Sequence, residues 1–404
     1  MSRDGNLNMS SEKSNSRRNV YMGIVLLGTV SLLGDVVYEG SRGLVPDYLK
    51  FLGATALVTG LVGGAGEFLG HAVRLVSGYL ADTTHAYWLF IFAGYGLIIS
   101  IPLLGVSYSL EFAVLLVLLE RLGKALRSPS RDTVLSVISK EVGTGKAFGL
   151  HEFLDQIGAV LGPLAVAILM FSTANDYQTT FSVLLVPFLA LLLALAYTYK
   201  RLKARTIIES KTTAPEKRKL SKPFYVYTFA VLLNTVGLLP AQLVLFKAAE
   251  IVRPLNQDWI VPLIYVLIQG VDAPVALASG YAYDKLGVKI LAVPFMLSVL
   301  PALFSFSNGG LTLLLVAAVF SGVVLGMQES IYRAAVSDLS PASSRGLAYG
   351  IFNTAYGTAI LLSGVVYGVM IDRGLSLYAV LAYSLVLQAA AVMGLARTRR
   401  TPRE

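Results

Sequence analysis

The chain of 404 residues contains no cysteine, and only 14% of its residues are charged. Missing cysteine excludes disulfides and every metal or redox site built from thiolates. Scarce charge goes with 55% hydrophobic residues and a mean hydropathy of +0.68, too apolar for a soluble protein of two domains. We therefore expect an all-α integral membrane protein, because helices satisfy their own backbone hydrogen bonds in lipid.

The short motifs of several enzyme classes are also missing. The sequence has no G-x-S-x-G, no H-E-x-x-H and no phosphate-binding P-loop. We expect neither an enzyme nor a cofactor, and no nucleotide-driven pump. A non-transporting sensor or receptor is an alternative from another class, but it calls for a large soluble extension, and the tails are short.

Long apolar runs divide the chain into spans, since about 20 apolar residues cross a bilayer core. We predict two pseudo-symmetric six-helix bundles, at residues 20–200 and 223–396, joined by a basic linker at 201–222. A polar, Ser/Asn-rich segment at 1–19 predicts a disordered tail rather than a signal peptide, and residues 397–404 form a basic tail. The twelve predicted spans are 20–41, 55–81, 86–107, 110–136, 146–171, 179–200, 223–246, 258–283, 288–307, 310–335, 346–371 and 375–396.

The net charge of +9 follows the predicted topology rather than a basic face for nucleic acid. With alternating loops, 26 of the 33 Lys and Arg residues fall on the side of the termini and five on the other. Basic loops stay in the cytoplasm, so both termini are predicted to be cytoplasmic in a multi-pass protein of the cell membrane. We expect protons, lipid and a small molecule as partners, no nucleic acid, and a monomer.

One short stretch occurs twice. Residues 77–82 read SGYLAD and residues 279–284 read SGYAYD, a shift of 202 residues that also carries Arg131 onto Arg333. Chance similarity rarely keeps such spacing, so we infer an ancient duplication. In each half, a Gly and an Asp lie at a helix end, and a later Arg can reach that Asp. These predicted gating residues are Gly78, Asp82 and Arg131, and Gly280, Asp284 and Arg333.

Twelve spans in two homologous halves, a basic central segment and the repeated G-x-x-x-D resemble the major facilitator superfamily. The second half carries the signature well, as GYAYDKLGVK at 280–289, whereas the first half lacks the cations after Asp82. Residues 120–132, ERLGKALRSPSRD, are similar to a subgroup of transporters with a GKGIR-x-x-x-RDA-like run. The resemblance implies alternating access, in which Asp–Arg latches break as the halves rock.

The run at 158–163, GAVLGP, is similar to the G-x-x-x-G-P motif associated with antiporters. Its predicted functional residues are Gly158, Gly162 and Pro163. Two glycines that normally follow are Ala165 and Val166 here. Close helix packing through Gly158 and Gly162 is an alternative, compatible explanation.

Ionisable residues inside predicted spans are functional candidates, because an unpaired charge in lipid is costly. Asp35 and Glu67 both lie about 22 Å from the cytoplasmic face at 1.5 Å per residue. Two such carboxylates close together favour a shared proton. Arg121 needs a counter-ion, for which Asp35 and Asp155 are the candidates. Arg42 near the outer end of its span has snorkelling as an alternative to function. The predicted proton-coupling residues are Asp35, Glu67, Arg121 and Asp155.

We predict a proton-coupled secondary transporter that exports a cationic or amphiphilic compound. The resemblance implies that spans 1, 4, 7 and 10 line the cavity, and tyrosines supply aromatic walls. A divalent-metal transporter is the alternative, with Glu67, His71, His151 and Glu152 as possible ligands. The predicted substrate-binding residues are Glu39, Asn234, Gln242, Asp272, Glu329, Tyr38, Tyr265 and Tyr332.

Overall fold

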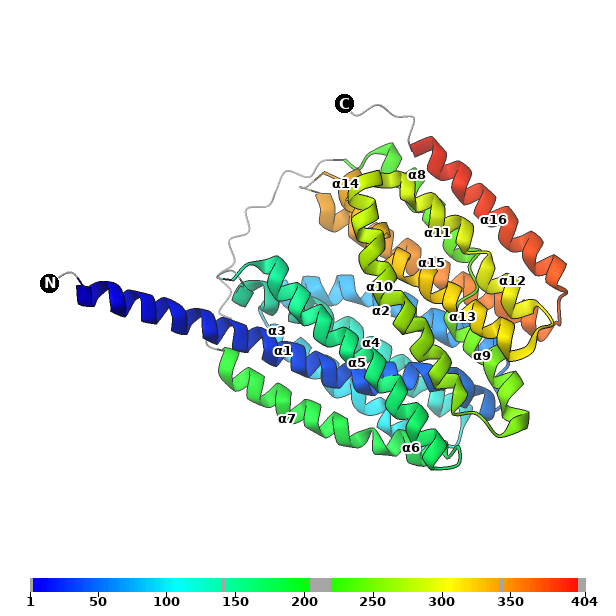
Figure 1. Ribbon diagram of the computed structural model, residues 1–404, viewed down its shortest axis with the longest axis horizontal. Helices are drawn as coiled ribbons and strands as arrows, with labels where there is room; N and C mark the ends of the chain where they lie inside the picture. Colours follow the sequence, from blue (N-terminus) through cyan, green and yellow to red (C-terminus); the bar gives the residue numbers. More distant parts are fainter. Residues whose placement is uncertain (1–2, 140–141, 204–218, 342–343, 399–404) are drawn as a thin grey trace.

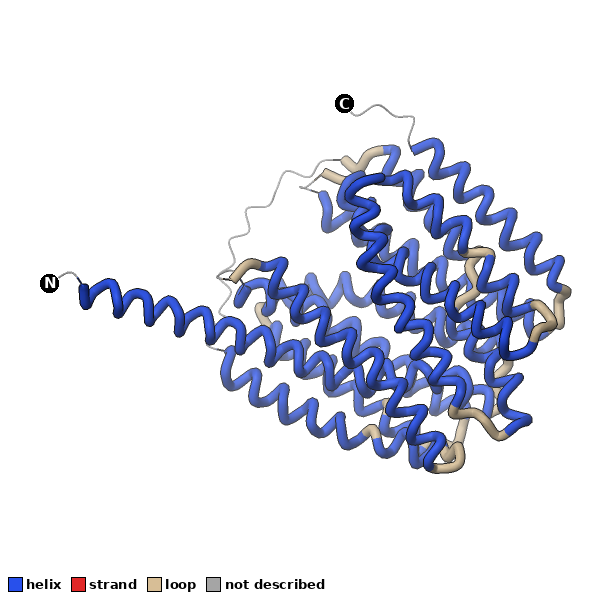
Figure 2. Tube along the Cα trace, viewed as in Figure 1, coloured by secondary structure: helices blue, strands red, loops and turns tan. Residues whose placement is uncertain are grey.

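The computed structural model describes residues 3–139, 142–203, 219–341 and 344–398. Within these ranges the ordered elements are helices, and no strand occurs (Figure 2). The elements are α1 (Arg3–Phe51), α2 (Ala56–Thr84), α3 (Tyr87–Gly96), η1 (Leu97–Ser100), η2 (Pro102–Val106), α4 (Leu110–Ile138), α5 (Thr144–Ser172), α6 (Tyr177–Val183), α7 (Leu185–Leu202), α8 (Lys222–Val236), α9 (Ala241–Val252), η5 (Arg253–Leu255), α10 (Ile260–Leu286), η6 (Gly287–Leu291), α11 (Ala292–Leu297), α12 (Leu300–Phe306), α13 (Gly310–Met327), the π-helical turn η7 (Gln328–Tyr332), α14 (Arg333–Leu339), α15 (Arg345–Asp372) and α16 (Leu377–Thr398).

Twelve membrane crossings account for these elements, as predicted. Ten segments of the described chain are long and apolar enough to span a bilayer. One of them, Ile260–Phe306, has 47 residues and reverses at Gly287, whose φ of 57° ends α10, so it crosses twice. The twelfth crossing is α4, which has 29 residues and several charges along its length. Its charges find partners inside the protein, as described below.

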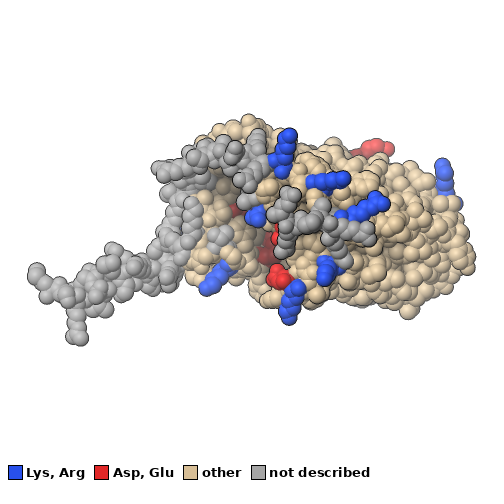
Figure 3. Space-filling model, turned by 90° about the horizontal axis from the view of Figure 1, so that it is seen from above, with Lys and Arg blue, Asp and Glu red and all other residues tan. Residues whose placement is uncertain are grey.

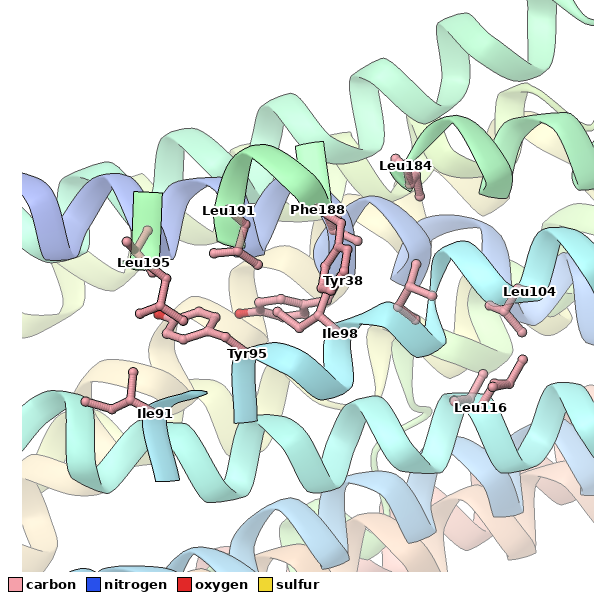
Figure 4. Close-up of a cluster of buried hydrophobic side chains, with 14 of the residues drawn as sticks. Tyr38, Ile91, Tyr95, Ile98, Leu104, Leu116, Leu184, Phe188, Leu191 and Leu195 are labelled. Atoms are coloured by element: carbon pink, nitrogen blue, oxygen red, sulfur yellow. The ribbon is translucent and has the colours of Figure 1, made fainter. Parts of the chain in front are cut away.

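The crossings form two groups that lie side by side, α1–α7 and α8–α16 (Figure 1). The helix α1 begins and α16 ends on the same side of the bundle, which we call the terminal end, and the other side is the distal end. Aromatic and aliphatic side chains from α1, α3, α4 and α7 fill the core of the first group (Figure 4). Tyr95, at 1% exposure, is among them, and its hydroxyl lies 3.0 Å from Ser31 Oγ.

Glycines bring the helices of the bundle into backbone contact. A Cβ on Gly158 would lie 2.6 Å from the carbonyl oxygen of Leu32, and one on Gly162 would lie 2.6 Å from that of Val36. These two glycines therefore allow α5 to pack closely on α1, as the helix-packing explanation of the G-x-x-x-G-P run predicts. Between the two groups, Gly60 of α2 meets Gly364 of α15, and a Cβ on either would overlap the other's backbone.

The first span is longer than predicted at both ends. The helix α1 continues past residue 41 to Phe51, through Pro46, and it extends back to Arg3 where a disordered tail was expected. Extending an existing helix costs far less than starting one, and no proline precedes Pro46. The charges Arg42, Asp47 and Lys50 are consequently part of a membrane helix. The predicted linker and C-terminal tail lie largely outside the described residues.

The seventh span is broken rather than continuous. Pro240 lacks an N–H and the chain leaves the helical path at Gly237, so α8 ends and α9 starts anew. Side chains of α15 and α16 satisfy the freed carbonyls. Tyr367 donates to Gly237 O at 2.7 Å and Tyr383 donates to Val236 O at 3.0 Å. Broken membrane helices are tolerated where protein groups replace the lost backbone bonds.

Candidate functional site

A cavity of about 920 Å³ lies between the two groups of helices. Its lining runs from Val45 and Thr59 on the distal side to Arg74, Arg131 and Arg333 on the terminal side. Seen from above, acidic side chains lie in a hollow in the middle of the molecule, with lysines and arginines around it (Figure 3). The cavity is thus polar and reaches towards the terminal end.

Polar contacts between the two groups gather at the distal end. Arg253 of η5 contacts Asp47 of α1, and its Nε donates to Asp258 at 3.1 Å. Tyr177 donates to Asp47 at 2.8 Å, and Lys50 forms an ion pair with Glu250 at 2.8 Å. Asp47 is fully buried and its neighbour Asp258 nearly so. We call Asp47, Tyr177, Arg253 and Asp258 the distal cluster.

Sequence reasoning missed the distal cluster, because the first span was ended at residue 41. A further distal contact joins Asp372 of α15 to the first turn of α2. Its carboxylate accepts from the backbone N–H of Ala56 at 2.8 Å and of Leu57 at 2.9 Å. The structure is therefore closed at the distal end.

The predicted Asp–Arg latches are not formed in this structure. Asp82 accepts a hydrogen bond from Tyr87 at 3.0 Å, and Arg131 pairs instead with Asp132 at 3.0 Å and Asp155 at 3.5 Å. Asp284 and Arg333 are both exposed, and no ion pair between them is present within the described ranges. Of the paired glycines, Gly78 lies against Pro129 and Gly280 against Ser330.

A partly buried ion network in the cavity wall joins α1, α2 and α4. Arg42 pairs with Glu39 at 3.0 Å and with Glu67 at 3.1 Å, and Arg121 pairs with Glu67 at 3.0 Å. Tyr265 of α10 donates to Glu39 at 2.7 Å, so the network reaches the second group. Sharing one acceptor oxygen between two guanidinium groups holds α1, α2 and α4 together at this level.

The network corrects three predictions. The counter-ion of Arg121 is Glu67, rather than Asp35 or Asp155. Glu67 pairs with two arginines rather than with Asp35, which lines the smaller cavity described below. Arg42 does not snorkel to an interface, since α1 continues for nine residues beyond it. For Arg42 the missing information was the length of α1, and for Arg121 and Glu67 it was the rotation of α2 and α4 relative to each other.

A second, smaller cavity of about 130 Å³ opens beside the large one, and we call it the acidic chamber. Glu39, Lys124 and Gln269 line both cavities, so the two are continuous. Six carboxylates line the chamber. They are Asp35, Glu39, Glu152, Asp155, Asp272 and Glu329.

The three cations of the acidic chamber are already paired. Lys124 lies 3.6 Å from Glu39 and donates to Tyr38 at 2.9 Å, and Arg127 lies 4.0 Å from Glu120. Arg131 pairs as described above. All three cations lie within α4, as the predicted span 110–136 implies. Their partners on α1 and α5 are shown only by the structure.

Most of the predicted substrate-binding residues line a cavity. Gln242, Tyr265 and Tyr332 line the large cavity, Tyr38 and Asp272 line the acidic chamber, and Glu39 and Glu329 line both. Asn234 does neither, which corrects its predicted role.

Asn234 is fully buried in the second group of helices. It donates to Gln388 at 2.7 Å and to Ser298 at 3.0 Å, and accepts from Tyr332 at 2.6 Å. It holds α8 to the end of α11, to η7 and to α16 instead of facing the cavity. An Asn in a membrane span can either bind substrate or join helices, and the sequence does not distinguish these two roles.

The alternative metal site does not assemble. Within the described ranges no group of three or more His, Cys, Asp or Glu is placed to hold a metal ion. The ring centroids of His71 and Tyr356 lie 5.7 Å apart, and Nδ1 of His151 lies 3.7 Å from Oδ2 of Asp155. Glu67 is held by arginines, so three of the four candidate ligands, Glu67, His71 and His151, serve separate contacts.

Comparison with known proteins places the chain in a family. The sequence model of the Major Facilitator Superfamily matches residues 27–364. The chain belongs to the major facilitator superfamily. An uncharacterised protein of Mycobacterium tuberculosis is 36% identical over 377 residues, covering 92% of this chain and 91% of the relative. An uncharacterised MFS-type transporter of Methanocaldococcus jannaschii is 27% identical over 371 residues, covering 89% and 91%.

Solved structures of the superfamily have the same fold. A mutant of the nucleoside transporter NupG superposes with a TM-score of 0.73 at 13% identity, covering 92% of this chain and 99% of that one. A mutant of the peptide transporter POT in complex with sulfate gives 0.70 at 14% identity, covering 94% and 95%. This protein is therefore a multi-pass membrane transporter of the superfamily, with the fold predicted from its sequence.

Proposed function

We propose that this transporter exports a cationic or amphiphilic compound in exchange for protons, by alternating access. The observation that carries the proposal is the arrangement of charge in the acidic chamber. Asp35, Glu152, Asp272 and Glu329 line it, and no ion pair or hydrogen bond within the described ranges reaches any of them. Unpaired carboxylates in a membrane protein call for a proton or another cation.

The large cavity contributes no net preference for charge. Six acidic and six basic side chains line it, counting histidine as neutral. Preference for a cation therefore comes from the acidic chamber, to which the cargo and the proton have access from the same cavity. Competition of the two for one set of carboxylates is a sufficient basis for exchange.

The positions of the contacts support alternating access. The distal cluster closes one end while the predicted latches at the other end are unformed. With the termini in the cytoplasm, as the distribution of basic residues favours, this is an inward-facing state in the cell membrane. Opening the distal end would require the distal cluster to separate, and closing the terminal end would allow Asp82 to meet Arg131.

Proton flux in liposomes tests the proposal. The purified protein is reconstituted with a luminal pH dye, and lipophilic amines are added in turn to the wild type, Asp35→Asn and Glu111→Gln. Glu111 is an exposed acid in the first turn of α4 and serves as the matched control. We expect amine-driven proton movement in the wild type and Glu111→Gln, and its loss in Asp35→Asn. A labelled amine that equilibrates without proton movement would refute exchange in favour of uniport.

A further inference from the structure

The acidic chamber has a second property besides its charge. Four acceptor oxygens of residues that line it are buried and have no hydrogen-bond partner within the described ranges. They are Asp155 Oδ1 and Gln156 Oε1 on α5, and Gln269 Oε1 and Asp272 Oδ1 on α10. Two come from each group of helices, so residues with unsatisfied oxygens line the chamber from both halves.

Burial makes these oxygens costly to leave unpaired. Asp272 is 1% exposed and Gln269 is 8% exposed. A buried acceptor without a donor loses its hydrogen bonds to water and gains none in return. The nearby cations do not supply donors to Asp272 or Gln269, since Lys124, Arg127 and Arg131 are engaged elsewhere. A donor that carries positive charge would satisfy these oxygens and also offset the excess of carboxylates over cations in the lining.

The shape and composition of the chamber restrict that donor. A volume of about 130 Å³ holds several water molecules or the head of a small organic cation. A bare metal ion is a poor fit, because no group of three or more potential ligands within the described ranges is placed to share one. Amide oxygens together with carboxylates suit an ammonium group, which donates three hydrogen bonds and accepts none.

We propose that the acidic chamber binds the protonated primary amine of the transported compound. Asp272 and Gln269 of α10 contact the ammonium group from one half, and Asp35 of α1 and Gln156 of α5 contact it from the other. The remainder of the compound extends into the large cavity, past Glu39 and Tyr265. This assignment rests on the proposed function, because it names the chemical group that the exchanged cargo presents.

A ligand in this position also acts on both halves at once. Since the ammonium group touches α5 and α10 together, its binding depends on how the halves sit relative to each other. The π-helical turn η7 places Glu329 at the same chamber, and such turns occur often at functional sites. Specificity for a primary amine follows from the number of acceptors, because a quaternary ammonium has no N–H to donate.

Thermal unfolding of the purified full-length protein in detergent tests the assignment. The probes are n-butylammonium, tetraethylammonium and sodium, each titrated as the chloride at constant ionic strength and pH. We expect n-butylammonium to raise Tm in the wild type and in the control Glu111→Gln. Asp272→Asn should need at least tenfold more of it for the same shift, and tetraethylammonium and sodium should have no effect at matched concentration.

Each other outcome overturns the assignment. An equal shift with tetraethylammonium shows that N–H donors are not recognised, and an equal shift with sodium shows a site for a hydrated metal ion. No shift with any cation shows that the chamber binds no amine, and an unchanged shift in Asp272→Asn shows that n-butylammonium binds elsewhere on the protein. If Asp272→Asn does not fold, Asp35→Asn is measured in its place with the same criterion.

The two proposals fail separately. The unfolding assay needs no membrane gradient, so binding of n-butylammonium without proton exchange in liposomes refutes the transport mechanism and leaves the amine site. Proton exchange that persists in Asp272→Asn, with no stabilisation by n-butylammonium, refutes the amine site and leaves the exchange.

Discussion

Replacing Arg253 with Gln should release the distal end of the protein. Arg253 of η5 contacts Asp47 and Asp258 and also donates to Tyr177 at 3.3 Å. Removing one partner of a fully buried ion pair costs about 3–5 kcal/mol. Because the Arg253 side chain is 29% exposed and Tyr177 still donates to Asp47, solvent and that hydrogen bond reduce the loss to roughly 1–2 kcal/mol.

That loss falls on the state closed at the distal end, since separation of the halves lets Asp47 and Asp258 meet water. Each 1.4 kcal/mol changes a population ratio about tenfold. We therefore expect the population open at the distal end to rise by roughly 5- to 30-fold in Arg253→Gln. The control is Glu250→Gln, which breaks the more exposed pair with Lys50 at the same end. An exposed pair contributes about 0–1 kcal/mol, so the control should shift the population little.

Spin-label distances measure this population directly. The chain has no cysteine, so labels can be attached at two introduced positions without removing native thiols. Tyr108 and Tyr378 suit this purpose, because they are 78% and 83% exposed and lie at the distal end of different halves. We expect Tyr108→Cys/Tyr378→Cys to gain a longer distance component on adding Arg253→Gln. Identical distributions with and without Arg253→Gln would refute the assignment of the distal cluster as the closing contact.

Two further predictions separate packing from function. Asn234→Ala removes a buried group that hydrogen-bonds Gln388, Ser298 and Tyr332, so the free energy of unfolding should fall by about 1–3 kcal/mol. Gln242→Ala, in the cavity lining, is the control and should leave Tm unchanged. Thermal unfolding in detergent measures both, and equal Tm values would contradict the placement of Asn234. Gly364→Leu adds a side chain where a Cβ already overlaps Gly60, so the contact of α2 with α15 should weaken by about 1–3 kcal/mol or more. The control is Gly346→Ala, whose Cβ meets nothing within 4 Å. Equal yields of folded protein for the two variants on size-exclusion chromatography would show that the halves do not pack through Gly364.

The number of spans followed from the sequence because lipid imposes a simple rule. A membrane helix needs an apolar run of sufficient length, and such a run is visible in one dimension. The predicted span at 110–136 and the observed α4, Leu110–Ile138, differ by two residues. The rule fails where charge is tolerated, as in α1, whose distal part carries Arg42, Asp47 and Lys50 and was predicted to be a loop.

Part of the candidate site was also visible in the sequence. Ionisable residues in spans are rare enough to stand out, and Asp35, Asp272 and Glu329 do line a cavity. Their partners were not visible, because a partner is chosen by helix level and rotation. Glu67 lies 54 residues from Arg121 and Asp47 lies 206 from Arg253, and no local pattern links such pairs.

The sequence by itself determined that this chain crosses the membrane twelve times, belongs to a duplicated architecture and carries buried charge in its first half. Those properties depend on composition and spacing along the chain. Tertiary structure alone decided which charges are neutralised and which are not. Lys124 pairs with Glu39 and Arg127 with Glu120, whereas Oδ1 of Asp272 has no donor among the described residues. The packing of α4 against α1 and of α5 against α10 decides this, because it brings some charges close together and keeps others apart.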